Sequence, residues 1–240
     1  MKTALIIASY KEVDALPILL RDLVEFLDES DVVVIADDSP LEFRSRIQKE
    51  CEDIFQNSKA SLLLSFGDIK SGRGNAIRRG IKMALVKYPD VNHVIEMDAD
   101  SSHQPTDIEK IRGVISEADL IIGSRYLKAS KIIGWPLSRR VFSKSLNLLI
   151  PRLLGISVKD ITNGLRRYKT QSAKLFLDAE PKNLGFTYLS EQALILHRAG
   201  CLIEEIPTTF VNRTVGKSTV THKEIVSSLR GIFELVKSNR

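Results

Sequence analysis

Short apolar runs alternate with longer amphipathic stretches over the first 123 residues. We expect each apolar run, rich in β-branched residues, to be a strand, and each amphipathic stretch to be a helix. The expected strands are 4–9, 32–37, 61–66, 93–98 and 119–124. The expected helices are 14–27, 74–88 and 105–116. Such alternation builds a mostly parallel central sheet flanked by helices, so the predicted fold class is α/β.

The pattern changes after Ser124. A basic loop, a pair of helices around 137–155, and short strands near 164–168 and 202–212 are predicted there, with amphipathic helices over 188–199 and 223–237. In the first half, Ser39-Pro40-Leu41-Glu42 has the form of a capping box at a helix start. Neither an internal repeat nor a low-complexity linker divides the sequence. We therefore expect a single domain over 1–240.

Charge is distributed very unevenly between the two halves. The net charge of +5 is the sum of −7 over residues 1–120 and +12 over residues 121–240. Such asymmetry indicates that the second half meets an anionic partner, which the charge alone leaves open among phosphate, a membrane surface and nucleic acid. Solvated surface charge is the alternative interpretation.

Cysteine usage and the apolar segments bear on location. Cys51 and Cys201 lie far apart without metal-ligand spacing, and the N-terminus does not have the form of a signal peptide, so a cytoplasmic location is predicted. The most apolar stretch, 146–158, is interrupted by Pro151 and Arg152 and is too short to cross a bilayer. It is predicted either to lie along a membrane surface or to pack on the core.

The strand ends hold the candidate chemistry. Ligands of open parallel sheets bind beyond the carboxyl ends of the strands, where 9–12, 37–38 and 98–100 place polar side chains. Asp98-Ala99-Asp100 puts two carboxylates after an apolar strand, a spacing that lets both reach one Mg²⁺ or Mn²⁺ together with substrate phosphates. Aspartate also caps helices and is common in loops, so the motif indicates a metal site only because it lies at a strand end beside other polar strand ends.

Two glycine-containing segments resemble other nucleotide-binding motifs without matching them. The segment at 72–74 lacks the third glycine of a dinucleotide fingerprint at the required position, and 216–219 lacks the first glycine of a P-loop, because Val211 stands there. A dehydrogenase and an ATPase are therefore disfavoured. Either segment can still contact phosphate through backbone N–H groups.

Basic residues of the second half are candidates for binding phosphate, since the planar guanidinium matches phosphate oxygens. For each one, a solvated surface position is the alternative. The candidates are Arg125, Arg139, Arg140, Lys144, Arg166, Arg167, Arg213 and Lys217. None of the four histidines has a convincing partner in the sequence, and His103 alone lies near the acidic motif.

Taken together, these motifs resemble family 2 glycosyltransferases of the GT-A fold, and within them the dolichol-phosphate mannose synthases. The resemblance covers nearly the whole chain, and the order and spacing of the motifs make it specific. The matching segments are SYKE (9–12), ADDSP (36–40), GRGNAIRRG (72–80), MDADSSHQP (97–105), IGSRYL (122–127), GWPLSRRVFSKSLN (134–147), DITNGLRRYKT (160–170), GFTYLSEQ (185–192) and FVNRTVGKST (210–219).

The resemblance implies site residues. It implies a nucleotide-binding half over 1–123 and an acceptor-binding half with amphipathic helices over 124–240. The implied donor-binding residues are Ser9, Tyr10, Glu12, Asp37, Gly72, Asp98, Ala99 and Asp100, with Asp98, Asp100 and Ser102 around the metal. The implied residues for acceptor or phosphate are Arg125, Arg139, Ser143, Lys144, Arg213 and Lys217. Asp100, Arg125 and Arg213 are the implied catalytic residues.

The family implies inverting transfer of a sugar, with mannose from GDP-mannose as the first expectation, onto a polyprenyl phosphate at the cytoplasmic membrane face. The enzyme is then expected to be a peripheral membrane protein, docked by 141–158 and its basic half or by an anchoring partner subunit. Open alternatives are a family 2 enzyme that uses a UDP-sugar and a non-lipid saccharide, and a nucleotide-sugar-binding protein without turnover. The acidic motif at 98–100 argues against nucleic acid as the partner.

Overall fold

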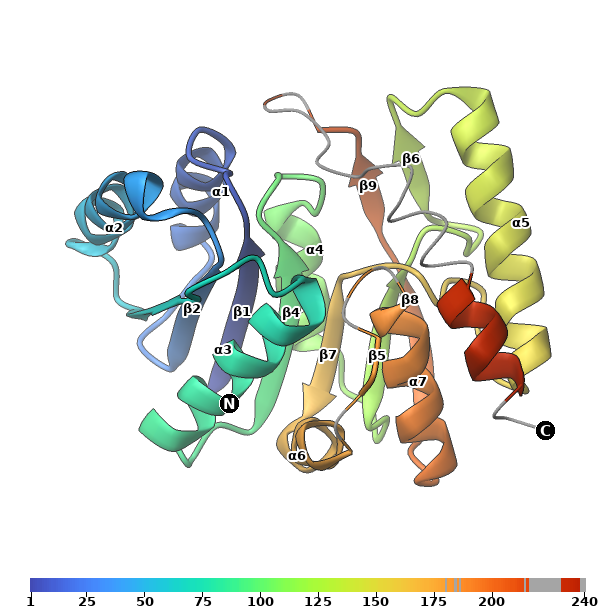
Figure 1. Cartoon of the computed structure of the whole chain (residues 1–240). Coiled ribbons are helices and arrows are strands. Elements are labelled where there is room, and N and C mark those ends of the chain that lie inside the picture. The colour runs from blue at the N-terminus through green and yellow to red at the C-terminus, as the bar shows by residue number, and fades with distance from the viewer. Residues whose placement is uncertain (180, 184, 186, 214, 216–229, 238–240) are drawn as a thin grey trace.

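The chain forms a three-layer α/β structure, seen in a computed structural model that describes all residues except 180, 184, 186, 214, 216–229 and 238–240 (Figure 1). Within the described residues, a seven-stranded sheet lies between two layers of helices. Four of its strand pairs are parallel and two are antiparallel. The predicted α/β class with a mostly parallel sheet is confirmed.

In the central sheet, strands from the second half of the chain lie beside strands from the first half. The order is β3-β2-β1-β4-β7-β5-β8, with β7 antiparallel to both of its neighbours. All five strands predicted in the first half are confirmed to within one residue at either end. The strands are β1 (Thr3–Ser9), β2 (Asp31–Asp37), β3 (Ser61–Phe66), β4 (His93–Asp98), β5 (Leu120–Ser124), β7 (Arg166–Lys169) and β8 (Ile203–Pro207).

Side chains alternate across the sheet and form two cores. Leu5 and Ile7 of β1 pack in the core beneath one helix layer, whereas Ala4 and Ile6 pack in the core beneath the other. The first layer holds α1 (Ala15–Val24), α2 (Leu41–Phe55) and α4 (Pro105–Gly113). The second holds α3 (Arg73–Lys87), α6 (Thr170–Asp178) and α7 (Tyr188–Arg198), flanked by α5 (Leu137–Leu154).

A second, two-stranded sheet pairs β6 (Lys131–Ile133) with β9 (Thr209–Val211), above β5 and β8 in Figure 1. It was expected only in part, since a loop was predicted where β6 forms, and one strand near 202–212 is divided into β8 and β9. The short α6 was also missed.

The predicted pair of helices around 137–155 is wrong. Residues 137–154 form one continuous helix, α5, with Pro151 in its last turn. Proline removes a backbone donor, but so close to the end it interrupts little of the ladder, and Gly155 at φ +72° ends the helix in the left-handed conformation.

The predicted capping box is also wrong. Helix α2 begins at Leu41 with Pro40 as its N-cap residue, and no side chain caps it. The hydroxyl of Ser39 instead donates to Asp37 Oδ2 over 2.9 Å and accepts the backbone N–H of Lys11 over 2.7 Å. Ser39 therefore ties the loops that follow β1 and β2 together.

The last predicted helix, 223–237, lies mostly outside the described residues. Residues 230–237 are helical. Within them Leu235 is buried, but Phe233, which was expected on the inward face, is 71% exposed. Among the helices that the structure describes, none has the length and apolar character required to span a membrane.

Candidate active site

The predicted polar strand ends come together at one edge of the sheet. Strands β2, β1 and β4 are adjacent and parallel, with Ser9 paired to Asp37 and Ala8 paired to Asp98. Their carboxyl ends therefore form one rim, on which the loops after all three strands converge. We call this group of strand ends and the loop 99–103 the acidic rim.

Asp98 is held by two basic side chains. Arg73 donates from Nε to Asp98 Oδ1 over 2.7 Å, and His103 Nε2 lies 3.3 Å from Oδ2. Burial alone would raise the pKa of Asp98, but the charge of Arg73 and the contact with His103 outweigh it and hold that pKa well below its ordinary value. Asp98 is therefore a carboxylate at any pH near neutrality.

Asp100 faces a different cation. Arg213 Nη2 lies 2.6 Å from Asp100 Oδ2, while its Nη1 lies 3.3 Å from Glu12 Oε1. The backbone N–H of Ser102 donates to Asp100 Oδ1 over 3.1 Å. Burial raises the pKa of Glu12, the nearby Arg213 opposes that rise, and the charges of Asp100 and Asp98 add to it. Arg213 thus joins two acidic loops at the rim.

Three buried serine hydroxyls line the same rim. The Oγ atoms of Ser9, Ser101 and Ser102 have no hydrogen-bond partner among the described residues. Ser101 has φ +59°, a left-handed conformation that turns the loop sharply after Asp100. Unpartnered buried oxygens next to carboxylates suit a cation or a polar ligand. Ala99 packs into the core, so only its backbone can meet a donor.

The residues predicted to bind the nucleotide are held in place by contacts within the protein. Both oxygens of Asp37 accept hydrogen bonds from Ser39, one from its backbone N–H over 2.8 Å. Tyr10 is half-buried, with the ammonium of Lys70 4.8 Å from its ring centre. Gly72, at φ +89°, is the N-cap residue of α3, where a side chain would strain the turn.

A buried network beneath the acidic rim was not predicted. Glu96 is fully buried and accepts hydrogen bonds from Arg73 Nη1 over 3.1 Å, from the hydroxyl of Tyr188 over 3.2 Å and from the hydroxyl of Tyr168. Arg73 therefore bridges Glu96 and Asp98. The available signal was a lone glutamate in an apolar strand, two residues before Asp98 and so on the same face.

Gly164 packs directly against this bridge. A Cβ at this position would lie 2.7 Å from Arg73 Nη2 and 3.0 Å from Asp98 Oδ2. We expect Gly164→Ala to displace the Arg73–Asp98 pair and lower kcat/KM about tenfold or more, at a cost in stability of about 1–3 kcal/mol. Steady-state kinetics and urea unfolding measure the two effects. Gly113→Ala is the matched control, because a Cβ there meets no atom within 4 Å; equal activity of the two variants would contradict the expectation.

Arg125 is the most firmly held of the predicted phosphate-binding residues. Its Nε and Nη2 donate to Asp160 over 2.7 and 2.8 Å, and Nη2 also donates to Thr162 over 2.7 Å. Its guanidinium lies 5.3 Å from the ring centres of both Trp135 and Phe210. None of the described residues accepts a hydrogen bond from Nη1, so one edge of the fork is left for a ligand.

The other predicted acceptor residues lie on or beside α5. Arg139 stacks 4.1 Å from the ring centre of Trp135, and burial together with the charges of Arg125 and Arg213 lowers its pKa. Ser143 accepts the hydroxyl of Tyr126 over 2.7 Å. Lys144 is exposed on α5, and Lys217 lies outside the described residues. The structure therefore gathers three arginines, 125, 139 and 213, next to the acidic rim.

Two arginines among the sequence candidates belong to the core instead. Arg166 is fully buried and donates to Gln192 and to main-chain carbonyls. Arg167 is 2% exposed and donates to the carbonyls that end α4. Neither is available for phosphate.

The acidic rim can supply a metal ion with carboxylates but not with a full ligand set. In the part of the chain that the structure describes, His, Cys, Asp and Glu side chains do not gather in threes or more at a possible metal position. Asp98, Asp100 and the unpartnered hydroxyl of Ser102 fit an ion that completes its shell with substrate phosphates and water, as Mg²⁺ usually does.

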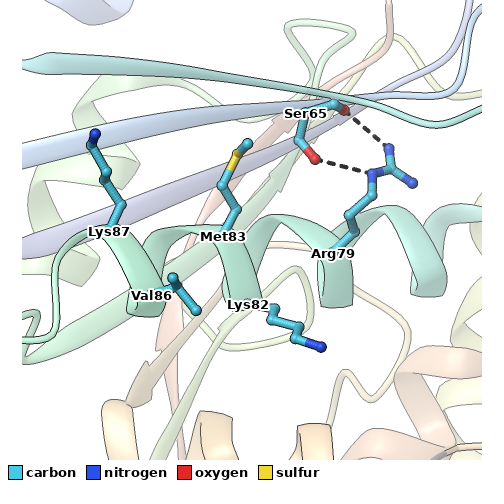
Figure 2. Close-up of a pocket in the computed structure, with 6 residues that line it drawn as sticks. All are labelled: Ser65, Arg79, Lys82, Met83, Val86 and Lys87. Atoms are coloured by element: carbon cyan, nitrogen blue, oxygen red, sulfur yellow. Dashed lines mark hydrogen bonds between the residues drawn. The ribbon is translucent and has the colours of Figure 1, made fainter.

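Two surface hollows lie elsewhere on the described part of the chain. Figure 2 shows one along α3 beside the edge strand β3, lined by Ser65, Arg79, Lys82, Met83, Val86 and Lys87, with Arg79 donating to Ser65 Oγ over 3.0 Å. A neighbouring hollow runs along the same edge strand towards α2. Neither includes a residue of the acidic rim or of the three-arginine group.

The fold is the GT-A fold of glycosyltransferases. The model of the family described as Glycosyl transferase family 2 matches residues 4–176, and the chain belongs to this family. It is 34% identical over 223 residues to an undecaprenyl-phosphate mannosyltransferase of Micrococcus luteus, covering 92% of this chain and 88% of that one. It is 26% identical to a polyprenol monophosphomannose synthase of Mycolicibacterium smegmatis, covering 97% and 86%.

Solved structures agree on the fold. A glucosyl-3-phosphoglycerate synthase from Mycobacterium tuberculosis, in complex with Mn²⁺, UDP and phosphoglyceric acid, superposes with a TM-score of 0.65 over 99% of this chain and 78% of that one. The same enzyme in complex with Mg²⁺ and UDP gives a TM-score of 0.63. At 14% identity these structures bear on the fold alone. Because the chain belongs to glycosyltransferase family 2, this protein is a glycosyltransferase, as the sequence predicted.

Proposed function

We propose that this enzyme transfers mannose from GDP-mannose to a polyprenyl phosphate at the cytoplasmic face of a membrane. The observation that carries the proposal is the contact of Arg213 with Asp100 of the acidic rim, with Arg125 and Arg139 close enough for their charges to interact with Asp98 and Asp100. One group suits a metal-bound diphosphate and the other suits a phosphate acceptor. The names of the two bacterial relatives support this choice of sugar and acceptor.

The chemistry needs positioning more than a base. A phosphate monoester is already ionised near neutral pH, so its oxygen can attack the sugar carbon without giving up a proton. Arg125 and Arg139 hold that oxygen opposite the leaving diphosphate, so that acceptor and donor are aligned for displacement. Asp98, Asp100 and Ser102 would hold a Mg²⁺ or Mn²⁺ ion, which would supply positive charge for the departing diphosphate.

Within this mechanism the chain's residues divide between the two substrates. Asp98 and Asp100 face the diphosphate, while Ser9, Tyr10, Glu12, Asp37 and Gly72 form the pocket for the rest of the donor. Arg125 is locked by Asp160 with one edge of its fork open, so it presents donors in a fixed direction. Arg139, Ser143, Lys144 and Lys217 complete the acceptor side. The nucleotide-binding and acceptor-binding halves, 1–123 and 124–240, follow this division.

The outer face of α5 supports docking on a membrane. Six apolar residues of this helix are 42–75% exposed, and they recur at the spacing of one helical face. Its inner face is tied to Arg125 through Thr162, which accepts from Asn147 over 2.8 Å. A lipid acceptor extending from the bilayer would thus reach the arginines beside the helix. The exposed residues are Leu137, Val141, Phe142, Leu148, Leu149 and Leu153.

Phe142→Asp is expected to weaken binding to vesicles that contain anionic lipid at least about tenfold. The change removes an aromatic ring that would be buried in the membrane and adds a negative charge that anionic lipid repels. Sedimentation with vesicles measures the bound fraction. Ile115→Asp is the control, since Ile115 is fully exposed but lies outside α5. Loss of binding in both variants, or in neither, would contradict docking through α5. Failure of the unmodified enzyme itself to bind the vesicles would favour an anchoring partner subunit.

Product extraction tests the function itself. The enzyme is incubated with Mn²⁺, undecaprenyl phosphate and labelled GDP-mannose, and the label is expected to enter the organic phase as a lipid. Parallel reactions contain UDP-glucose as donor or a soluble saccharide as acceptor. Label that reaches only the soluble saccharide would contradict the lipid acceptor. Lipid product formed only from the UDP-sugar would contradict the donor.

A further inference from the structure

The guanidinium of Arg213 contacts a rim carboxylate that a bound metal ion would also need. It contacts Asp100 Oδ2 at 2.6 Å and Glu12 Oε1 at 3.3 Å, so its single positive charge is shared between two acids. Asp98 is contacted by different side chains, Arg73 at 2.7 Å and His103 at 3.3 Å. Arg213 is therefore the cation with which a metal ion has to compete for Asp100.

The backbone that carries Arg213 is fixed close to this position. Val211 donates its N–H to the carbonyl of Ser102 over 3.1 Å, and Phe210 forms a β-bridge with His103. We therefore expect release of Asp100 to come from rotation of the Arg213 side chain and not from movement of this backbone.

We infer that Arg213 occupies the metal position through its contacts with Asp100 and Glu12, and that it exchanges these carboxylates for diphosphate oxygens when metal and donor bind together. The inference rests on the proposed metal site and extends it. Metal alone has to compete with an internal ion pair. A nucleoside diphosphate gives Arg213 another partner and frees Asp100, so metal and nucleotide strengthen each other's binding by linkage.

Mn²⁺ binding to the whole protein tests this exchange without any turnover. Free Mn²⁺ has an EPR signal that is lost on binding, so affinities are obtained with and without GDP, after subtraction of Mn²⁺ bound by GDP alone. Arg213→Ala is expected to bind Mn²⁺ without GDP at least about tenfold more tightly than the unmodified enzyme. Arg213→Gln, which keeps the side chain's length and polarity, is expected to shift the affinity in the same direction.

GDP is expected to tighten Mn²⁺ binding by a larger factor in the unmodified enzyme than in either Arg213 variant. Arg152→Ala is the charge-matched control: Arg152 is exposed and donates to the carbonyl of Leu148, so both affinities should stay within about twofold of the unmodified enzyme. An equal gain in Arg152→Ala would reduce the effect to general electrostatics and overturn the exchange.

Two further outcomes separate this inference from the proposed function. If GDP-dependent Mn²⁺ binding and mannosyl transfer are present but the Arg213 variants bind Mn²⁺ no more tightly than the unmodified enzyme, the exchange is wrong and the function stands. If the unmodified enzyme binds no Mn²⁺ even with GDP, the metal site and the exchange are both wrong.

Discussion

Asp100→Asn is expected to lower kcat/KM for sugar transfer about 10³-fold, equivalent to about 4 kcal/mol of transition-state stabilisation. The amide keeps the shape of the side chain and can still accept the N–H of Ser102, so the fold should persist. It loses the negative charge that faces Arg213 and, in our proposal, the metal. Transfer of labelled mannose over a range of Mn²⁺ concentrations measures the loss.

Asp53→Asn is the matched control for this loss. Asp53 is an exposed residue of α2, and its variant should keep the activity of the unmodified enzyme. Activity of Asp100→Asn within about tenfold of the unmodified enzyme, at saturating Mn²⁺, would remove Asp100 from the mechanism.

Arg73→Ala is expected to have the largest effect on stability, lowering the free energy of unfolding by about 3 kcal/mol at neutral pH. Removing this guanidinium leaves the fully buried Glu96 and the partly exposed Asp98 without their shared cation. The depressed pKa of Asp98 contributes stability that is present above the unfolded carboxyl's pKa and is lost as pH falls through the folded value. The difference between variant and unmodified enzyme should therefore shrink in acid, below about pH 4.

Urea unfolding at several pH values measures this difference. Lys82→Ala removes an exposed cation from the same helix and is expected to change stability by no more than about 0.5 kcal/mol. A loss in Arg73→Ala that stayed constant between neutral and acidic pH would show that packing, and not charge, accounts for it.

The central sheet and the position of the acidic rim could be predicted because both follow from local patterns. Apolar runs gave the strands, and parallel strands bring their carboxyl ends to one edge, so the meeting of Ser9, Asp37 and Asp98 needed no long-range information. The same local pattern predicted a strand near 164–168 but could not reveal its place in the sheet, because β7 enters between β4 and β5 from far along the chain.

The contacts that organise the site join residues distant in sequence, and these were beyond prediction. Nothing near Arg213 indicates Asp100 as its partner, and nothing near Arg125 indicates Asp160. Arg166 illustrates the opposite error: its charge suggested a surface position, but buried carbonyls and Gln192 satisfy its donors in the core. Residue type therefore indicated phosphate binding without distinguishing a ligand-binding arginine from a structural one.

The most direct test of the account is the position of manganese in a crystal grown with Mn²⁺ and GDP, located by anomalous scattering. The account predicts a single strong peak about 2.0–2.3 Å from carboxylate oxygens of Asp98 and Asp100 and from diphosphate oxygens. It also predicts that Arg213 contacts phosphate and no longer Asp100. Manganese bound elsewhere, with GDP in place and the Arg213–Asp100 pair intact, would contradict it.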